Sequence, residues 1–265
     1  MKIISQNPGG RNVELLSLLH KQFKCASEKD VADARREFEW GLDYYRNRIE
    51  AIDFHNNNNV LDAACGCGQY SIALAEKNQF VTGLDINPGY IEISQHISSK
   101  FKLQNTRFLV GNLHSIPFAN ESFDAIFCYS ALMYTREDRV ISEFARVLQP
   151  GGSLYICSDG AGWPIYKLVV ESFRNKRFRS IIGSIRLILN TSIYNILLST
   201  TTHHRTFLPY RFLAKYFQKN KLKIDYYGPE GRYGNLNYQL FSPRINETFF
   251  GLPSDFEVLG KRFNK

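Results

Sequence analysis

Residues 60–75, VLDAACGCGQYSIALA, place an apolar segment, an acidic residue, a glycine-rich stretch and a second apolar segment in direct succession. The first apolar residues are typical of a buried strand. Ala64, Gly66 and Gly68 then occupy every second position. Small residues are needed there if the backbone turns sharply and lets a ligand approach closely. The segment therefore predicts a strand, a tight loop and the start of a helix.

The loop and the start of the helix would present backbone N–H groups that suit the anionic end of a ligand, and Asp62 adds the opposite charge. A second apolar segment, 80–84, ends at Asp85, 17 residues after Gly68. A carboxylate at such a strand end can reach two ribose hydroxyls. A dinucleotide dehydrogenase would prefer glycine where this chain has Ser71, and its pyrophosphate would lie near the acid. S-adenosylmethionine fits better, because Asp62 suits the ammonium group of an amino-acid moiety.

Two later regions continue the pattern. Residues 106–110 predict a third strand, which is followed by Asn112 and Leu113, and residues 125–129 predict a fourth strand. After a helix, the motif LQPGGSLYI at 148–156 predicts the fifth. These landmarks occur in a fixed order, which is more specific than a glycine-rich loop alone.

In this order, the landmarks resemble those of the class I S-adenosylmethionine-dependent methyltransferases, particularly those that act on small molecules. The resemblance covers about residues 58–158 and, weakly, 203–265. It implies a Rossmann-like α/β fold with helices on both faces of a seven-stranded sheet. The implied strand order is 3-2-1-4-5-7-6, with the last strand antiparallel. It also implies S-adenosyl-L-methionine as the cofactor and S-adenosyl-L-homocysteine as the product.

The resemblance further implies which residues surround each part of the cofactor. They are Asp62, Ala64, Gly66 and Gly68 for the methionine part, Asp85 and Ile86 for the ribose, Asn112 and Leu113 for adenine, and Tyr129 with Ser130 for the sulfonium and the substrate gap. The family more often has Asp at position 112, and the Asn112 amide oxygen can still accept a hydrogen bond from the adenine amino group. Ala64 replaces a common glycine, and its methyl group narrows the loop slightly.

We expect the chain to divide into three parts. A helical cap at 1–59 precedes a methyltransferase core formed by 60–159 and 203–265, and a helical lid at 160–202 is inserted after the fifth strand. The core should end with a helix that begins near Pro209, a strand at 222–227 and a last strand at 256–263. Residues 232–253 have no clear period and predict a loop near the site.

The cap is predicted to contain helices at 12–24 and 28–53. Trp40 and Tyr44 are four residues apart and share one face of the second helix. Aromatic residues at this spacing usually belong to a core. In the methyltransferases that the chain resembles, an N-terminal helix often closes over the cofactor and substrate, so Tyr44 is a candidate substrate-binding residue.

The lid carries most of the chain's net charge of +8. Between Gly160 and Arg205, seven residues are basic and one is acidic. This surface would attract an anionic substrate, a phospholipid surface or nucleic acid, and a solvated helix face explains the charge equally well. The uncharged stretch 187–202 has 16 residues, fewer than the roughly 20 that cross a bilayer. A lid packed on the core is the favoured interpretation, with peripheral membrane contact as the alternative.

Transfer to an oxygen acceptor requires a base that removes a proton, whereas an amine can lose its proton before attack. The candidate bases are His114, Tyr134, Asp159, His203 and His204, of which Asp159 and the two adjacent histidines are best placed. Tyr134 is also a candidate substrate-binding residue. Arg205 could bind a phosphate or carboxylate through its planar guanidinium, or it could cap a helix.

The predicted function is methyl transfer to an O or N atom of a small, anionic acceptor, such as a phosphorylated metabolite or sugar. RNA methylation and noncatalytic sensing of S-adenosylmethionine are the alternatives. After the fourth strand the chain has CYSA at 128–131, not the N/D-P-P-Y/F motif of adenine-amino methylation, so nucleic acid is not the expected partner. Five scattered cysteines predict neither disulfides nor a metal site, and we expect a cytoplasmic protein. The oligomeric state is not predicted.

Overall fold

The computed structural model describes most of the predicted core and the second half of the cap. The described residues are 19, 23–166, 181–182, 185, 188–189, 207–231, 233, 248–249, 252–253 and 255–264. Most of the expected helix at 12–24, most of the expected lid and most of the expected loop at 232–253 lie outside them. Among the described residues, no helix is long and apolar enough to cross a membrane.

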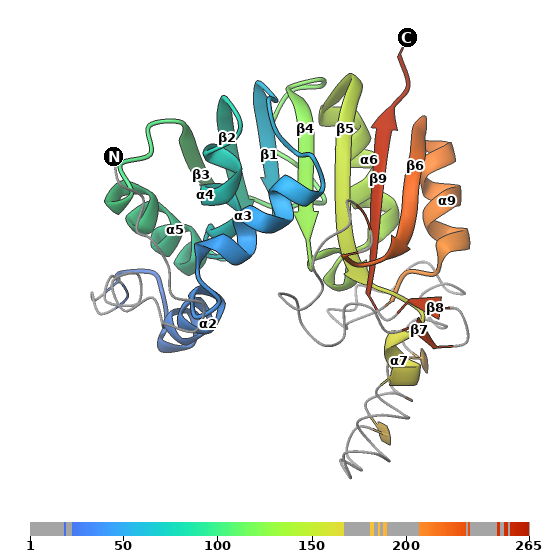
Figure 1. Ribbon diagram of the computed structural model, residues 1–265, viewed down its shortest axis with the longest axis horizontal. Helices are drawn as coiled ribbons and strands as arrows, with labels where there is room; N and C mark the ends of the chain where they lie inside the picture. Colours follow the sequence, from blue (N-terminus) through green and yellow to red (C-terminus); the bar gives the residue numbers. More distant parts are fainter. Residues whose placement is uncertain are drawn as a thin grey trace.

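The core is a seven-stranded sheet in the order β3-β2-β1-β4-β5-β9-β6 (Figure 1). Its strands are β1 (Asn59–Ala63), β2 (Phe80–Asp85), β3 (Thr106–Val110), β4 (Phe123–Tyr129), β5 (Leu148–Asp159), β6 (Leu222–Pro229) and β9 (Asp255–Arg262). β9 runs antiparallel to both of its neighbours, and the pairs among the first five strands are parallel. The predicted order and the antiparallel last strand are confirmed. A short hairpin, β7 (Thr248–Phe249) with β8 (Leu252–Pro253), was not expected.

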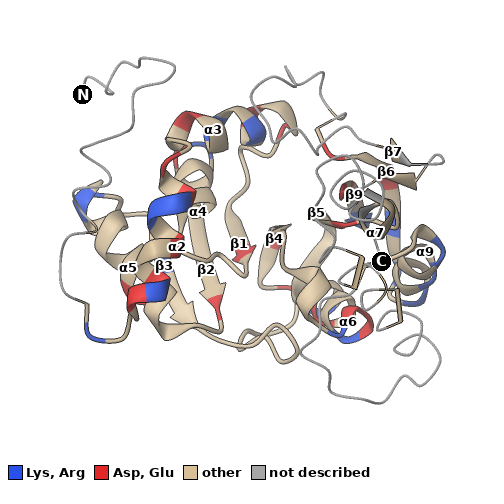
Figure 2. Cartoon of the chain, turned by 90° about the horizontal axis from the view of Figure 1, so that it is seen from below, with Lys and Arg blue, Asp and Glu red and all other residues tan. Residues whose placement is uncertain are grey.

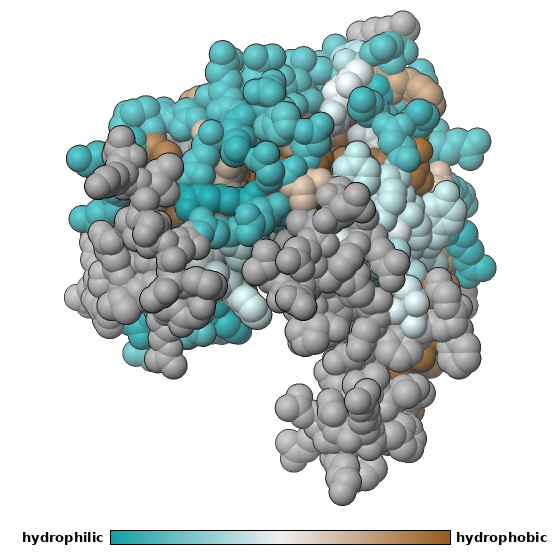
Figure 3. Space-filling model, viewed as in Figure 1, coloured by the Kyte–Doolittle hydropathy of each residue, from teal (hydrophilic) through white to brown (hydrophobic). Residues whose placement is uncertain are grey.

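Helices cover both faces of this sheet. One face carries α2 (Glu28–Phe38), α3 (Leu42–Ala51), α4 (Gln69–Ala75) and α5 (Pro88–Lys100); the other carries α6 (Glu137–Val147) and α9 (Tyr210–Lys219). Two shorter helices, η2 (Leu132–Tyr134) and α7 (Trp163–Tyr166), follow the ends of β4 and β5. The space-filling view shows a mainly hydrophilic outer surface where α3 and α4 cover the sheet (Figure 3).

Helices can pack on both faces of the sheet because side chains along each strand alternate between the two faces. Val60 and Phe127 belong to the core cluster beneath α2 to α5. Leu61 and Ile126, their neighbours in the chain, belong to the cluster beneath α6 and α9. All four side chains are fully buried, so these central strands are apolar on both faces.

The prediction of one helix at 28–53 is wrong, because the chain forms two helices there. Gly41 separates α2 from α3 with a φ of 72°, a left-handed conformation that an α-helix cannot contain. α2 begins at a capping box, in which the Ser27 side chain and the Asp30 side chain each accept a hydrogen bond from the other residue's backbone. After this break, α3 packs against α4 on one face of the sheet (Figure 1).

The strand order reverses between β1 and β4. Connections from β1 lead outward to β2 and β3, whereas β4 leads the other way to β5. Ligands of open α/β sheets bind outside the carboxyl ends of the strands at such a switch point. Figure 2 views this edge from below, and acidic residues mark the ends of β1 and β2 there.

Candidate functional site

The loop between β1 and α4 has an unusual backbone. Ala64, Gly66 and Gly68 all have positive φ angles, of 63°, 54° and 85°. Glycine adopts this region freely, whereas alanine does so at a cost. At the end of β4, on the other side of the switch point, Ser130 also has a positive φ, of 55°. Strained residues of this kind cluster at functional sites, and two of them flank the point where the strand order reverses.

Asp62, the last but one residue of β1, lies beneath this loop and is 2% exposed. Its Oδ2 accepts a hydrogen bond of 2.5 Å from the Ser71 hydroxyl of α4. Burial raises the pKa of Asp62 to about 7; the charge of Asp85 adds to the rise, and the bond from Ser71 opposes it. Ser71 therefore contributes a hydrogen-bond donor at the place where a dehydrogenase would prefer glycine.

Asp85 ties the loop to the end of β2. Its Oδ2 accepts from the Gly66 backbone N–H at 2.9 Å, and its Oδ1 accepts from the Asn87 backbone N–H at 2.9 Å. Burial raises the pKa of Asp85, and the hydrogen bonds from these amides oppose the rise. Each oxygen retains a further lone pair, so the carboxylate can hold the loop and still accept from a ligand hydroxyl.

The residues predicted to border adenine lie beside Asp85. The Gly111 backbone N–H donates to the Asp85 carbonyl at 2.8 Å, which joins the ends of β2 and β3. Asn112 follows directly, and its side-chain oxygen accepts from the His114 N–H at 2.9 Å. Leu113 is buried, whereas Ile86 is 67% exposed. The structure thus places all four predicted ribose and adenine residues at one corner of the sheet.

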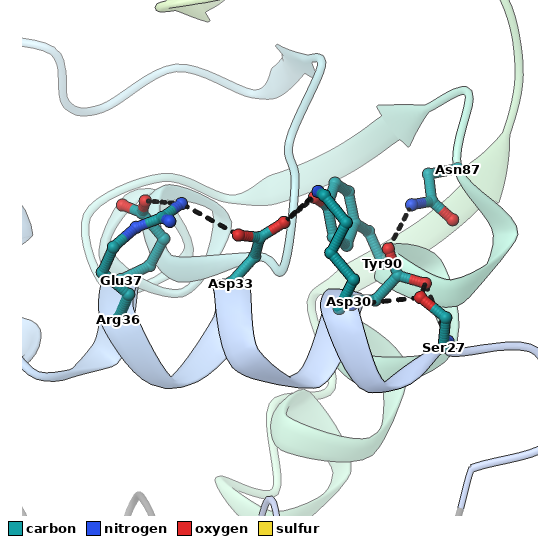
Figure 4. Close-up of polar contacts among 8 residues, drawn as sticks. Ser27, Asp30, Asp33, Arg36, Glu37, Asn87 and Tyr90 are labelled. Carbon is teal, nitrogen blue, oxygen red and sulfur yellow. Dashed lines mark hydrogen bonds and ion pairs between the residues drawn. The ribbon is translucent and has the colours of Figure 1, made fainter.

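The cap helix α2 is fastened to this corner by polar contacts (Figure 4). Asp30 Oδ1 accepts from the Asn87 side-chain amide at 2.7 Å, and Asp33 Oδ2 accepts from the Tyr90 hydroxyl at 2.9 Å. Asn87 is the N-cap of α5 and directly follows Ile86. The contacts therefore fix α2 beside the predicted ribose position.

Across the switch point, a buried polar cluster joins α3, the end of β4 and the residue after β6. Arg48 of α3 has no exposed surface, and its Nη2 lies 2.6 Å from Glu230 Oε1. The Tyr129 hydroxyl donates to the same Glu230 oxygen at 2.7 Å, and the Arg48 guanidinium lies 4.8 Å from the centre of the Tyr129 ring. Tyr44 and Tyr129 are only partly buried, so this cluster borders the candidate site. Glu230 was missed in the sequence because no motif surrounds it.

A second buried carboxylate, that of Glu257, is linked to Arg48 through the Tyr155 hydroxyl. Glu257 of β9 is fully buried, and its Oε2 accepts from the Tyr155 hydroxyl at 3.1 Å. Tyr155 in turn accepts a hydrogen bond of 3.2 Å from Arg48 Nη1. Burial raises the pKa of Glu257, against the effect of backbone hydrogen bonds from Tyr233 and Gly231. Arg48 is therefore linked to two buried carboxylates. The spacing of Tyr44 and Arg48 on one helix face could have indicated that this arginine points inward.

Only some of the predicted catalytic and substrate residues lie in the described part of the chain. Asp159 ends β5 and is 2% exposed, whereas Tyr134 ends η2 and is 55% exposed. His203, His204 and Arg205 lie outside the described residues. The ring of His114 accepts a hydrogen bond from the backbone N–H of Arg136 at 2.9 Å, and burial lowers the pKa of this histidine.

The five cysteines are free thiols, four of them buried. Within the described ranges, no group of three or more His, Cys, Asp or Glu side chains could hold a metal ion. Burial raises the pKa of Cys67 in the loop, which keeps this thiol protonated at neutral pH. The polar groups that the described residues bring to this edge of the sheet are carboxylates, backbone amides, tyrosines and one arginine.

Known proteins match a part of the chain that includes β1, the glycine-rich loop and α4. A family model described as "Methyltransferase domain" matches residues 60–152. Over 146 residues, the chain is 29% identical to a demethylmenaquinone methyltransferase of Listeria monocytogenes serotype 4a, which corresponds to 53% of this chain and 61% of the relative. The chain thus spans about six tenths of that curated relative's length.

Solved structures share the fold at low sequence identity. The YcgJ protein of Bacillus subtilis superposes with a TM-score of 0.53 at 18% identity, over 84% of this chain and 99% of that one. A geranyl diphosphate C-methyltransferase of Streptomyces coelicolor A3(2), solved with Mg²⁺, geranyl diphosphate and S-adenosyl-L-homocysteine, gives a TM-score of 0.57 at 14% identity. That superposition covers 89% of this chain and 81% of the other.

Proposed function

We propose that this chain, whose residues 60–152 match a family model described as "Methyltransferase domain", is a class I S-adenosylmethionine-dependent methyltransferase that transfers a methyl group to a small, anionic acceptor. The acceptor atom is an oxygen or a nitrogen, and a phosphorylated metabolite or sugar is the expected class. The observation that carries the proposal is the pair of carboxylates, Asp62 and Asp85, on either side of the left-handed loop at the β1–β4 switch point.

The residues at the switch point suit the parts of this cofactor. Gly66 has open space where a side chain would begin, with only the flexible end of Gln69 near 4 Å, so a ligand can approach the backbone there. Asp85 suits two ribose hydroxyls, and the buried charge of Asp62 suits an ammonium group. Asn112 and Leu113 would border the adenine ring, and Tyr129 would face the sulfonium.

The sulfonium supplies an activated methyl group, so the protein mainly has to orient the acceptor and exclude water. The cap, at 1–59, and the lid, at 160–202, are the parts we assign to covering the acceptor. Tyr44 and Tyr134 would contact it. Asp159, His203 and His204 remain the candidates for removing a proton from an acceptor hydroxyl.

The anionic character of the acceptor is supported by charge. The lid sequence has seven basic residues and one acidic residue between Gly160 and Arg205, and Arg205 offers a planar guanidinium to a phosphate or carboxylate. A structural neighbour was solved with geranyl diphosphate, itself an anion. We place the reaction in the cytoplasm, where the buried thiols would stay reduced.

A product screen tests the proposal. The purified chain would be incubated with S-adenosylmethionine whose methyl group carries deuterium, together with pooled phosphorylated metabolites and nucleotide sugars. Mass spectrometry should find an acceptor that gains one labelled methyl group, with equal formation of S-adenosylhomocysteine. Transfer only to RNA, or cofactor binding without turnover on any pool, would contradict the proposed acceptor class.

A further inference from the structure

The polar cluster formed by Arg48, Tyr129 and Glu230 has the donor set of an anion-binding site. Arg48 Nη2 forms an ion pair with Glu230 Oε1 at 2.6 Å, and the Tyr129 hydroxyl donates a hydrogen bond to the same oxygen at 2.7 Å. Charge-assisted hydrogen bonds of this length are the contacts that bind carboxylate or phosphate ligands. Here the oxygen belongs to the protein itself.

The charges of the cluster are unbalanced. Glu230 and Glu257 are 3% and 0% exposed, and one guanidinium, that of Arg48, lies between them. The two carboxylates are held differently. Glu257 is fixed by a hydrogen bond of 2.8 Å from the Tyr233 backbone N–H, whereas the donors that hold the Glu230 carboxylate are the side chains of Arg48 and Tyr129. Glu257 can therefore compensate the buried arginine when Glu230 moves away.

A neighbouring hydroxyl independently indicates a position where a ligand oxygen could bind. Tyr70, in the first turn after the glycine loop, is 4% exposed, and its hydroxyl has no hydrogen-bond partner among the described residues. Its ring lies 4.8 Å from that of Tyr129, and the charges of Arg48 and Glu230 both act on it. A buried hydroxyl without a partner costs free energy comparable to a lost hydrogen bond. A ligand oxygen between the loop and the cluster would remove that cost.

We infer that Arg48 and the Tyr129 hydroxyl form a binding site for a ligand carboxylate or phosphate, and that Glu230 occupies this site until the ligand displaces it. The site lies at the carboxyl end of β4, beside the switch point, where Tyr129 and Tyr44 are partly exposed. The inference rests on the proposed function for its location beside the cofactor. The anion belongs either to the amino-acid part of the cofactor or to the acceptor.

The exchange leaves the net buried charge of the site unchanged. In the free protein, Glu230 and Glu257 together exceed Arg48 by one negative charge. When a ligand anion takes the place of Glu230 on Arg48, the guanidinium keeps a partner at each end, and the carboxylate of Glu230 can reach water. The internal carboxylate competes with the ligand, so its removal should strengthen ligand binding, whereas removal of the arginine should weaken it.

Isothermal titration calorimetry on the full chain tests this competition with three probes. S-adenosylhomocysteine carries the amino-acid carboxylate, 5′-deoxy-5′-methylthioadenosine lacks the amino-acid moiety, and inorganic pyrophosphate represents an acceptor anion. The variants are Glu230→Gln, which keeps the shape but removes the charge, and Arg48→Gln. Asp225→Asn is the matched control, since Asp225 is an exposed β6 carboxylate paired with Lys223 at 2.7 Å.

Glu230→Gln should bind the anionic probe roughly 10-fold more tightly, and Arg48→Gln should bind it roughly 10- to 100-fold more weakly. If the two variants change the affinity for S-adenosylhomocysteine in these opposite directions but leave the affinity for methylthioadenosine unchanged, the site binds the cofactor carboxylate. Opposite shifts for pyrophosphate alone would assign it to the acceptor. The Asp225→Asn control should bind every probe as the wild-type chain does.

The inference is overturned if Glu230→Gln binds both anionic probes no more tightly than wild type, or if the control shows the same gain. This holds even where Arg48→Gln does not fold, because the Glu230→Gln variant keeps Arg48 and its hydrogen bond to the Tyr155 hydroxyl. A wild-type chain that binds neither adenosine probe would contradict the proposed function. The pyrophosphate arm would then decide the inference by itself.

Discussion

The buried carboxyl of Asp62 makes the stability of this protein depend on pH in an unusual direction. Burial raises the pKa of Asp62 from 3.8 to about 7. The unfolded chain releases this proton near pH 4, whereas the folded protein keeps it until neutral pH. The group therefore contributes stability that is fully present below the unfolded pKa and is lost as the pH rises through the folded pKa.

The magnitude follows from the shift. At 1.36 kcal/mol per pKa unit, a rise of about three units corresponds to about 4 kcal/mol between pH 4 and pH 7. Asp62→Asn removes the titration but keeps an oxygen that can accept from Ser71. The variant's free energy of unfolding, relative to wild type, should therefore increase by about 3 kcal/mol between pH 5 and pH 8.

Urea denaturation of wild type, Asp62→Asn and Asp225→Asn at half-unit pH steps measures this difference. Asp225→Asn, which replaces an exposed carboxylate of β6, is the control variant. A difference between Asp62→Asn and wild type that does not change from pH 5 to pH 8 would refute the reasoning, because Asp62 would then ionise alike in both states.

The same series with S-adenosylhomocysteine tests the assigned role of Asp62. If its carboxylate pairs with the ligand's ammonium group, the ligand favours the ionised form and lowers the pKa of Asp62. The gain in stability at saturating ligand should then grow from pH 5 to pH 8 in wild type but not in Asp62→Asn. An equal gain at each pH would place the ammonium group elsewhere.

Three further substitutions test the loop. Asp85→Ala should weaken S-adenosylhomocysteine binding by roughly 1.5 to 3 kcal/mol in calorimetry, because it removes charge-assisted hydrogen bonds; unchanged affinity would refute that placement. Gly68→Ala should lower the free energy of unfolding by about 2 to 4 kcal/mol, since a Cβ there would lie 2.8 Å from the Ser94 Cβ at a φ of +85°. Ala64→Gly should raise it by about 0.5 to 1 kcal/mol, because its φ of 63° is costly for alanine; a loss of stability would contradict this.

The core of the fold could be predicted because its signals are local. Segments such as 106–110 coincide with an observed strand, and the helix expected near Pro209 begins at Tyr210. Apolar runs, glycines and acids in a fixed order were sufficient for this. The break at Gly41 was missed because the helical spacing of apolar residues continues across it, and a single glycine does not always end a helix.

The candidate cofactor residues were also indicated locally, since each follows a predicted strand end. The structure places Asp62 and Asp85 at neighbouring strand ends, as expected, and adds a contact that the sequence did not predict: Asp85 holds the backbone of Gly66. Their contacts with a cofactor remain predictions. Whether a carboxylate binds a backbone amide or a ligand hydroxyl depends on distances that the sequence alone does not give.

The polar cluster around Arg48 could not have been predicted in this way. Its arginine and Glu230 are 182 positions apart in the chain and meet because β6, which lies beyond β9 and runs parallel to β5, ends at the same edge of the sheet as β4. The Tyr129 hydroxyl completes the contact from the end of β4. The sheet topology therefore has a consequence for chemistry, because the end of the edge strand β6 places an acid on the arginine of the cap. Any ligand anion at this point must compete with that acid, so affinity for anions would be set by residues from opposite ends of the chain.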